Sequence, residues 1–393
     1  MKHLYLFTGK FPFSITTECF LEDEIVYLAN KFDAIHIIPL QSETESPKQL
    51  PANCIVLKPL LSNRFLSVLR GSFNFKVVLL LIKEFFNYKV YEDRIKFLNW
   101  VKCYYISNNL LNSKRIRNIK NTIQEDDVCY FYWGKWSNLL SIFWKGKCRM
   151  VSRFHGEFDL WEEVHHGYVP LREKVVNSLD SAVFISSKGQ RYFHEKYPNV
   201  NTIFIPLGSS DIKPAVYSKS DAIRVLSCSN VIPLKRVDLL YKSLLEIKGK
   251  TIKWVHIGNG SEMDKLKSLI TEEKSDNVQV ELKGAMNHSD VVEYYSNNCF
   301  DVFVNLSTIE GVPVSIMEAI SCNIPVVATN VGGTSEVVNK ETGLLISSNP
   351  NTVEVATAIH DVVGLGLHPR LFWEKNYDAV KNYTKFTDYI YSL

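Results

Sequence analysis

Residues 301–329 read DVFVNLSTIEGVPVSIMEAISCNIPVVAT and hold one complete strand–helix–strand unit. The two ends of this unit, DVFVN and PVVAT, are apolar runs typical of parallel strands that are buried on both faces. Between them, Glu310 lies in a loop, Pro313 suits the first turn of a helix, and Glu318 lies in the middle of that helix. The unit therefore predicts a parallel sheet whose strands are joined by helices.

The same alternation extends over the rest of the chain. Expected strands lie at residues 3–8, 34–39, 54–58, 127–132, 148–154, 181–186, 202–206, 223–227, 253–257, 278–283, 301–305, 325–329 and 343–346. Helical patterns lie between many of them, including residues 234–247, 263–273 and 353–363. This order predicts an α/β protein with doubly wound parallel sheets and right-handed crossovers.

The alternation breaks once, at residues 206–220, which are rich in Pro, Gly and Ser. A chain of 393 residues is longer than the roughly 250–300 residues of a single core, so we expect two domains. We place the first at 1–208 and the second at 209–368. The tail, 369–393, is a helical pattern rich in aromatic residues. It is either a last helix of the second domain or a helix that packs back on the first.

The composition is that of an ordinary globular protein, with 46% hydrophobic residues, 22% charged residues and a formal net charge of +3. That charge is too small to indicate a nucleic-acid-binding protein. The eight cysteines form no CxxC pair, so we expect reduced thiols and no metal site. The first residues do not resemble a signal peptide, and no apolar run approaches the roughly 20 residues that span a bilayer. We therefore expect a cytoplasmic protein, either free or peripheral on the inner face of the cell membrane.

The loop around Glu310 is the strongest candidate for a ligand site. It lies where a helix begins at the carboxyl end of a parallel strand, and open α/β sheets bind ligands at this place. The free N–H groups and the positive end of the helix dipole favour a phosphate there. Glu310 and Glu318 could accept hydrogen bonds from sugar or ribose hydroxyls. Two glutamates eight residues apart also occur by chance on a charged helix.

Glu310 and Glu318 stand as E-x7-E in EGVPVSIMEAISCNIPVVATNVGGTSEVV, residues 310–338. This segment resembles the nucleotide-sugar motif of the retaining family-4 glycosyltransferases. These enzymes have the GT-B fold, in which two Rossmann-like domains with parallel sheets face each other across a cleft. The resemblance implies that Glu318 holds the ribose hydroxyls of a nucleoside-diphosphate sugar and that Glu310 lies beside the donor sugar, with no separate cofactor and no metal. The backbone expected to line the diphosphate and sugar belongs to Gly311, Val312, Pro313 and Val314.

A second segment, SCSNVIPLKRVD at residues 227–238, resembles the family's strand, loop and helix that carry an arginine and a lysine for the diphosphate. Lys235 aligns with the lysine. Asn230 stands where the arginine is usual, and Arg236 is a candidate to replace it. From the residues alone, Lys235 and Arg236 could equally begin a solvated helix face.

Two glycine-containing turns are further candidates. Gly258 and Gly260 resemble the family's turn over the nucleotide base, although an ordinary tight turn has the same composition. Gly9 follows the first expected strand, and the resemblance implies that its loop approaches the donor phosphates or the acceptor. Without the family, Gly9 is simply a turn glycine.

His155 lies in RFHGEFD, residues 153–159, which resembles the His-Gly-x-Asp region of the same family. The spacing differs, because two residues separate Gly156 from Asp159 here. The resemblance implies that His155 touches the donor sugar or orders the reacting groups. We therefore expect Glu310, His155 and Lys235 to be the catalytic residues.

Residues 60–125 match the family poorly and are basic and aromatic. The cations there are Arg64, Arg70, Lys76, Lys83, Lys89, Arg94, Lys96, Lys102, Lys114, Arg115, Arg117 and Lys120. The aromatic residues among them are Phe73, Phe75, Phe85, Phe86, Phe97, Trp100, Tyr104 and Tyr105. Helices of this composition either lie on an anionic membrane surface or pack on the first sheet with their lysine side chains reaching into solvent.

The resemblance as a whole predicts a hexosyltransferase-like enzyme that moves a sugar with retention, in the assembly of capsule, O-antigen or another polysaccharide. Its first domain would bind a saccharide or lipid-linked saccharide acceptor, and its second the nucleotide sugar. Two alternatives stay open. One is another nucleotide-sugar enzyme of the same fold, such as an epimerase or a phosphorylase. The other is a non-catalytic sugar-nucleotide-binding protein, for which Asn230 is a hint.

Overall fold

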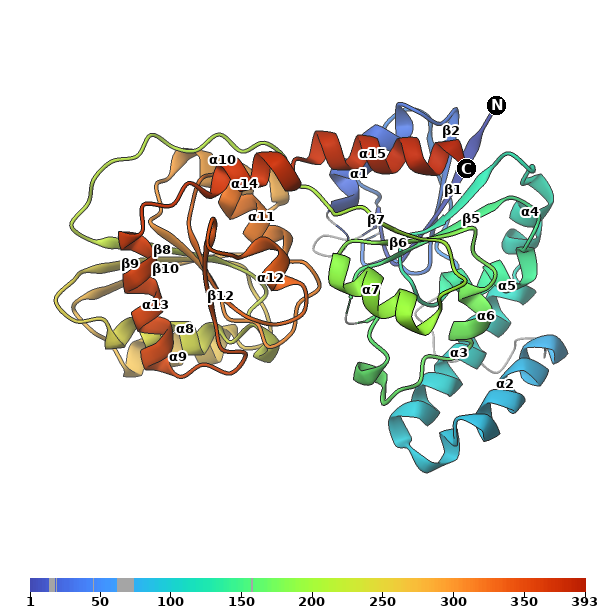
Figure 1. The fold of residues 1–393 in the computed structure, drawn as a ribbon, viewed down its shortest axis with the longest axis horizontal. Coiled ribbons are helices and arrows are strands. Elements are labelled where there is room, and N and C mark those ends of the chain that lie inside the picture. The colour runs from blue at the N-terminus through green and yellow to red at the C-terminus, as the bar shows by residue number, and fades with distance from the viewer. Residues whose placement is uncertain (14–17, 19, 45, 62–73, 157) are drawn as a thin grey trace. The chain divides into compact units, whose positions relative to one another are not determined.

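The structure is a computed structural model that describes residues 1–13, 18, 20–44, 46–61, 74–156 and 158–393. The chain divides into two compact units, Met1–Ile205 with Tyr383–Leu393, and Pro206–Asn382. Each unit is a parallel sheet with helices on its faces (Figure 1), so the predicted α/β class with two doubly wound sheets is confirmed. Some residues named above lie outside the described residues: Cys19, Arg64, Arg70, Phe73 and Glu157.

The sheet of the first unit has seven strands in the order β3-β2-β1-β4-β5-β6-β7. Their bounds are β1 His3–Thr8, β2 Ala34–Pro39, β3 Cys54–Val56, β4 Val128–Phe131, β5 Arg149–Phe154, β6 Ser181–Phe184 and β7 Thr202–Phe204. The α-helices are α1 Phe20–Ala29, α2 Phe75–Asn87, α3 Arg94–Asn112, α4 Lys114–Thr122, α5 Ser141–Trp144, α6 Arg172–Val176 and α7 Ser187–Lys196. Short 3-10 turns lie at η2 Val90–Glu92, η3 Ser137–Leu140 and η4 Glu163–His165.

Alternate side chains of β1 enter two different cores. Leu4 and Leu6 pack with α1 and with the end of the chain, whereas Tyr5 and Phe7 pack with α3, α4 and α5. Both sets are buried, which explains why β1 reads as a continuous apolar run in the sequence.

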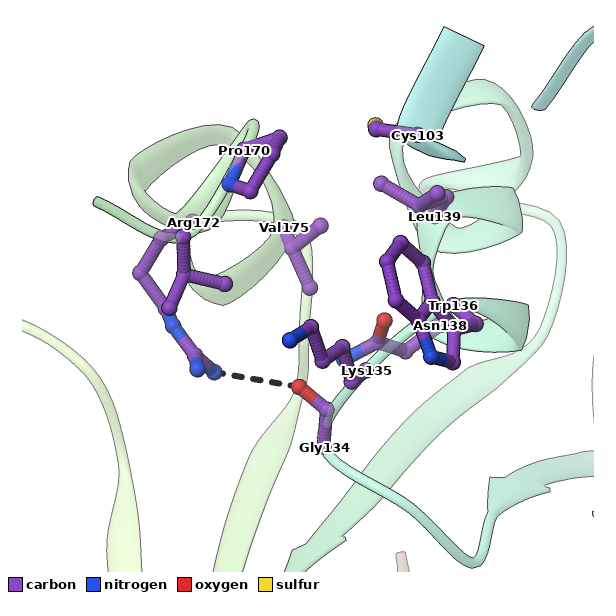
Figure 2. Close-up of a pocket in the computed structure, with 10 residues that line it drawn as sticks. Cys103, Gly134, Lys135, Trp136, Asn138, Leu139, Pro170, Arg172 and Val175 are labelled. Carbon is purple, nitrogen blue, oxygen red and sulfur yellow. Dashed lines mark hydrogen bonds between the residues drawn. The ribbon is translucent and has the colours of Figure 1, made fainter. Parts of the chain in front are cut away.

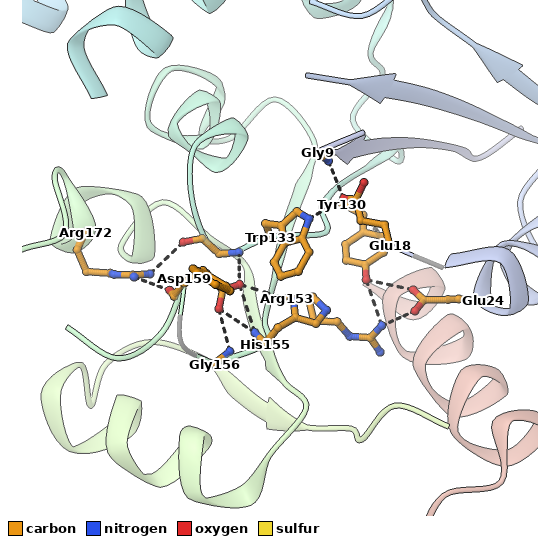
Figure 3. A network of polar contacts seen from close by, with 12 residues as sticks. Gly9, Glu18, Glu24, Tyr130, Trp133, Arg153, His155, Gly156, Asp159 and Arg172 are labelled. Atoms are coloured by element: carbon orange, nitrogen blue, oxygen red, sulfur yellow. Dashed lines mark hydrogen bonds and ion pairs between the residues drawn. The ribbon is translucent and has the colours of Figure 1, made fainter. Parts of the chain in front are cut away.

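The C-terminal tail is two helices, α14 Pro369–Asn376 and α15 Ala379–Ser392, where the sequence suggested one continuous helical pattern. The break occurs because Ser209 pairs with the backbone on both sides of Asp378. Within the first unit, Phe386 of α15 is fully buried and its ring lies 3.9 Å from the guanidinium carbon of Arg153. Arg153 also forms a buried ion pair with Glu24 (Figure 3).

The sheet of the second unit has six strands in the order β10-β9-β8-β11-β12-β13. Their bounds are β8 Ile223–Cys228, β9 Ile252–Ile257, β10 Val278–Gly284, β11 Val302–Asn305, β12 Val326–Thr329 and β13 Gly343–Ile346. The remaining elements are η5 Pro233–Lys235, α8 Val237–Glu246, α9 Met263–Glu272, α10 His288–Asn297, α11 Val314–Ser321, α12 Thr334–Val337 and α13 Thr352–Gly364. Each of the thirteen predicted strands has a counterpart among the described strands, and the strand predictions are confirmed to within two residues at each end.

Candidate functional site

The loops that follow β8 and β11 carry the charged residues predicted for the second unit. These strands are neighbours, with Val302 beside Val225, so their carboxyl ends lie together at one edge of the sheet. The backbone N–H of Thr308 donates to the carbonyl of Leu234 at 2.8 Å and ties the two loops to each other. This edge is where an open parallel sheet binds ligands.

Lys235 and Glu310 meet at this edge. Lys235 Nζ lies 2.6 Å from Glu310 Oε1, and the two side chains are 23% and 12% exposed. The same oxygen accepts from Ser307 Oγ at 2.6 Å and from Asn305 Nδ2 at 3.2 Å. Two of the predicted catalytic residues therefore form one charge-assisted network. Asn305 and Ser307 could not be found from the sequence, because polar residues at or just after the end of a strand carry no motif of their own.

Arg236 is placed differently from the prediction. Its Nε donates to the carbonyl of Leu306 at 2.6 Å, and its Nη2 donates to the carbonyls of Ser307 at 3.1 Å and Ser348 at 2.9 Å. The guanidinium thus ties the loop after β11 to the loop after β13. Because these donors are engaged with the backbone, the geometry gives Arg236 a framework role and does not support its replacing a phosphate-binding arginine. Asn230 is exposed in the loop after β8.

Glu318 is buried in α11 and faces a histidine that the sequence analysis did not single out. Glu318 Oε1 lies 2.7 Å from Nε2 of His288, the first residue of α10. A histidine can donate from Nε2 as a neutral tautomer or as a cation, and either form satisfies the buried carboxylate. The contact holds the side chain of Glu318 against α10, so it links the helix that follows β10 to the helix that follows β11.

The predicted glycines allow the loops of this edge to pack closely. Gly258 has φ 141°, and a Cβ there would lie 1.9 Å from the carbonyl oxygen of Ser229. A Cβ at Gly332, which has φ 52°, would lie 1.7 Å from the carbonyl oxygen of Glu310. Gly260 is similarly close to the loop after β8. Only glycine fits such approaches, so these residues shape the site whether or not they touch a ligand.

The backbone before α11 is held in place by a neighbouring loop. Gly333 N–H donates to the carbonyl of Gly311 at 2.7 Å. Val312, Pro313 and Val314 are buried, and Pro313 caps α11 in an extended conformation. The helix therefore begins at a fixed point ahead of Glu318, with its first N–H groups unpaired within the helix as at any helix start.

In the first unit, His155 lies after β5 and packs against two aromatic rings, of which that of Trp133 is labelled in Figure 3. The centroids of Tyr132 and Trp133 are 4.5 and 4.6 Å from that of His155. Neither ring nitrogen of His155 has a hydrogen-bond partner among the described residues, and Nδ1 lies 3.6 Å from Asp159 Oδ2. An imidazole that is 10% exposed and lacks a hydrogen-bond partner is suited to bind a polar ligand group.

Asp159 holds the loop on which His155 stands. Its carboxylate accepts from the backbone N–H groups of His155, Gly156 and Gly134 at 2.9–3.2 Å. Burial alone would raise the pKa of Asp159, but the interaction with His155 and these backbone donors hold it below its ordinary value. Asp159 therefore supplies a carboxylate to this loop, although its spacing from Gly156 differs from that of the family.

Gly9 faces a carboxylate of the chain itself. The backbone N–H groups of Gly9, Lys10 and Phe11 donate to Glu18 at 2.6–2.7 Å, and Trp133 Nε1 donates at 2.6 Å (Figure 3). These three consecutive N–H groups form a nest that would suit an anion. Glu18 occupies this nest, so a phosphate could bind these N–H groups only in place of Glu18. That the Gly9 loop approaches the donor phosphates or the acceptor stays a prediction.

Lys135 lines a small cavity of about 10 Å³ at the carboxyl end of β4, together with Arg172 (Figure 2). The volume is room for about one water molecule. Lys135 Nζ lies 3.3 Å from His165 Nε2 and 4.8 Å from the ring centroid of Trp136. Burial and the nearby Arg172 lower the pKa of Lys135 to about 8. Among the described residues, no three His, Cys, Asp or Glu side chains gather in a way that could hold a metal ion.

Residues 209–380 match the family described as glycosyl transferases group 1. The match contains the whole edge built around Lys235, Glu310 and Glu318. The second unit therefore contains a segment similar to the group 1 glycosyltransferases. Among curated proteins similar to this chain is the UDP-N-acetylglucosamine–peptide N-acetylglucosaminyltransferase GtfA subunit of Streptococcus agalactiae. It is 30% identical over 176 residues, which are 42% of this chain and 33% of the relative.

A second relative is one of the subunits of human phosphatidylinositol N-acetylglucosaminyltransferase. It is 28% identical over 160 residues, which are 39% of this chain and 31% of the relative. The chain therefore matches about a third of the length of these two relatives.

Two solved structures extend the likeness over the whole chain. Sucrose-phosphate synthase from Thermosynechococcus elongatus has a TM-score of 0.72 and 15% identity, covering 99% of this chain and 98% of its own. The lipopolysaccharide outer core galactosyltransferase WaaB has a TM-score of 0.68 and 15% identity, covering 99% of each chain. At such identity the likeness concerns the fold, which is GT-B.

Proposed function

We propose that this protein is a glycosyltransferase that moves a sugar from a nucleoside-diphosphate sugar to an acceptor hydroxyl, with retention of the anomeric configuration. The observation that carries the proposal is the Lys235–Glu310 pair at the carboxyl ends of neighbouring parallel strands, within the segment that matches the family. An ammonium group suits the diphosphate of a donor, and a carboxylate suits the hydroxyls of its sugar.

In the proposed reaction, the bond between the anomeric carbon and the donor phosphate oxygen breaks. A bond from the acceptor oxygen to the anomeric carbon forms on the same face, and the acceptor proton passes to the leaving phosphate. Lys235 would offset the negative charge that develops on this leaving group. Donor binding would then exchange partners: Lys235 leaves Glu310 for a phosphate, and Glu310 accepts from a sugar hydroxyl.

The remaining roles follow from the positions of the side chains. Glu318 would accept hydrogen bonds from the ribose hydroxyls, with His288 holding its carboxylate in place. Gly311, Val312, Pro313 and Val314 would present backbone to the diphosphate and sugar at the start of α11. In the first unit, His155 would gain its missing hydrogen-bond partner from a substrate hydroxyl.

UDP-sugars are the first donors to test. Several relatives are named as UDP-N-acetylglucosamine-dependent enzymes, and solved structures of similar fold contain UDP or UDP-glucose. One relative is named as GDP-mannose-dependent, so GDP-mannose is the natural comparison donor.

We further propose that the acceptor is a saccharide or lipid-linked saccharide, in the assembly of a bacterial surface polysaccharide. The names of the similar proteins support this, since they include a lipopolysaccharide galactosyltransferase and enzymes that act on phosphatidylinositol. We place the reaction on the cytoplasmic side of the membrane. None of the seven cysteines that the structure describes forms a disulfide, which suits a reducing compartment.

The reaction can be tested with purified protein, UDP- and GDP-sugars and glycan acceptors, by mass spectrometry of products and NMR of the new linkage. Lys235→Met should lower transfer at least about a hundredfold. Lys242→Met is the matched control, because Lys242 is an exposed lysine of α8. Conversion of the donor without an acceptor would indicate an epimerase or hydrolase instead. Wild-type turnover by Lys235→Met would overturn the site.

A further inference from the structure

Helix α2 has two apolar faces, and only one of them packs against residues that the structure describes. Val77 and Leu81 are fully buried against a core cluster that includes Cys103 of α3. The opposite face presents Phe75, Leu79, Ile82 and Phe86, and all four are exposed. Phe75 and Phe86 are 64% and 65% exposed to solvent. Large side chains spaced at helical intervals on the outside of a helix indicate a second, missing contact.

The exposed apolar surface continues across η2 onto α3. Its members there are Tyr91, Ile95, Phe97, Leu98 and Val101. Phe85 joins the two helices, since its ring centroid lies 5.3–5.7 Å from those of Phe86, Tyr91 and Trp100. We call this surface the hairpin face. In the rest of the described chain, exposed large apolar residues are spread over many elements, and such residues need no explanation.

Cations surround the hairpin face. The exposed ones are Lys76, Lys83, Lys89, Arg94 and Lys102. Of the acidic residues in α2, η2 and α3, Glu84 is buried and accepts from Tyr168, so it does not offset them. Glu92 is exposed, and its contact with Lys89 is 3.7 Å long. The face is therefore both apolar and positively charged.

We propose that the hairpin face binds the headgroup region of a membrane containing anionic lipid, with α2 and α3 lying in the plane of the surface. Figure 1 shows the two helices side by side, joined through η2. The apolar side chains would enter the boundary between headgroups and acyl chains, about 5–10 Å deep, while the cations meet anionic headgroups. In the part of the chain that the structure describes, no helix is long and apolar enough to cross a bilayer.

The charges favour a bilayer over a second copy of the chain. A twofold contact pairs one patch with the same patch, so the cations around the hairpin face would meet cations. An anionic surface places opposite charges there and accepts the aromatic side chains in the same contact. The inference does not depend on the proposed sugar transfer, because vesicle binding is measured with neither donor nor acceptor present.

The test is flotation of the full chain with vesicles of phosphatidylcholine alone or with phosphatidylglycerol. We expect retention on the anionic vesicles, reduced by salt. Phe75→Ser with Phe86→Ser should lower the partition coefficient about tenfold or more. Each of Lys76→Gln and Lys83→Gln should lower it about fivefold. Hydrogen exchange should show protection by vesicles confined to α2, η2 and α3.

The matched control is Val353→Ser with Leu371→Ser, which removes exposed apolar side chains from the second unit. It should float like the wild type, and unchanged thermal unfolding of both double variants shows that each is folded. The proposal is overturned if the wild type does not float, or if the hairpin variant floats equally well. It is also overturned if light scattering shows a dimer that Phe86→Ser dissociates.

Discussion

Both units hold a glutamate with several hydrogen-bond donors near the carboxyl end of a central strand, but the donors differ. Glu18 is buried and accepts from the backbone N–H groups of Gly9, Lys10 and Phe11, and also from Trp133 Nε1. Glu310 accepts from side chains, those of Lys235, Asn305 and Ser307. Backbone donors cannot turn away without unfolding the loop, whereas side-chain donors can rotate toward a ligand. The comparison indicates that Glu18 stabilises the first unit. It supports the proposal that Glu310 exchanges its side-chain donors for a substrate hydroxyl.

The prediction with the largest expected effect on this comparison is a loss of turnover in Glu310→Gln. An amide of the same size keeps the packing but cannot pair with Lys235 or accept as strongly from a sugar hydroxyl. We expect kcat to fall about a thousandfold, about 4 kcal/mol of transition-state stabilisation, with little change in thermal unfolding. Donor affinity, measured by calorimetry, should stay close to wild type, because Lys235 is then free for the diphosphate.

Glu293→Gln is the control for this variant, since Glu293 is an exposed glutamate of α10. If Glu310→Gln instead unfolds at markedly lower temperature, the carboxylate has a structural role and the contrast with Glu18 disappears.

Glu18→Gln should have the opposite profile. Its amide NH₂ would face backbone N–H groups, leaving buried donors unsatisfied at a cost of about 1–3 kcal/mol each. We expect the free energy of unfolding of the first unit to fall by about 3 kcal/mol in urea titrations followed by tryptophan fluorescence. Glu195→Gln, an exposed change on α7, should leave it unchanged. A Glu18→Gln protein of wild-type stability that has lost turnover would break the comparison.

A smaller effect is expected at the second glutamate of the motif. Glu318→Gln removes the charge opposite His288 and would weaken the proposed hydrogen bonds to the ribose hydroxyls. We expect the Kd for the nucleoside diphosphate to rise about tenfold, which is about 1.4 kcal/mol, with kcat changed less. His288→Gln should raise Kd by a smaller factor. An unchanged Kd in Glu318→Gln, measured by calorimetry with UDP and GDP, would remove the ribose assignment.

The strands were predictable because burial on both faces of a parallel sheet leaves continuous apolar runs, as in β1 and β11. The break between α14 and α15 was not, because Ser209 causes it from a distant part of the chain. Local periodicity cannot report such a contact. The role of α2 could not be decided from the sequence either. Apolar residues line two of its faces, so its composition fitted both packing on the sheet and membrane binding.

The paired residues of the site were predictable only where a motif carries them. Glu310, Glu318 and Lys235 were singled out in the sequence; Lys235 and Glu310 meet at one edge of the sheet, and Glu318 pairs with His288. His288 lies 30 residues before Glu318, and Trp133 lies 115 residues after Glu18, so neither partner could be inferred from spacing. Nothing in the sequence shows that Glu18 folds back into the nest that begins at Gly9.

The last prediction concerns a pH dependence and compares two lysines, one in each unit. Lys235 pairs with a carboxylate, whereas Lys135 lies beside His165 and the ring of Trp136. Burial lowers the pKa of Lys135 to about 8 from 10.5, so between these values the unfolded chain binds a proton that the folded chain has released. Stability then rises with pH in this window, and well below pH 8 the group adds no pH dependence.

We expect the free energy of unfolding of the wild type, relative to Lys135→Met, to rise by about 1–2 kcal/mol between about pH 7.5 and 9.5. Lys174→Met, an exposed change on α6, should give a curve parallel to the wild type. If the stability curve of Lys135→Met is also parallel to that of the wild type, burial does not destabilise the Lys135 ammonium. The contrast between Lys135 and the carboxylate-paired Lys235 would then disappear.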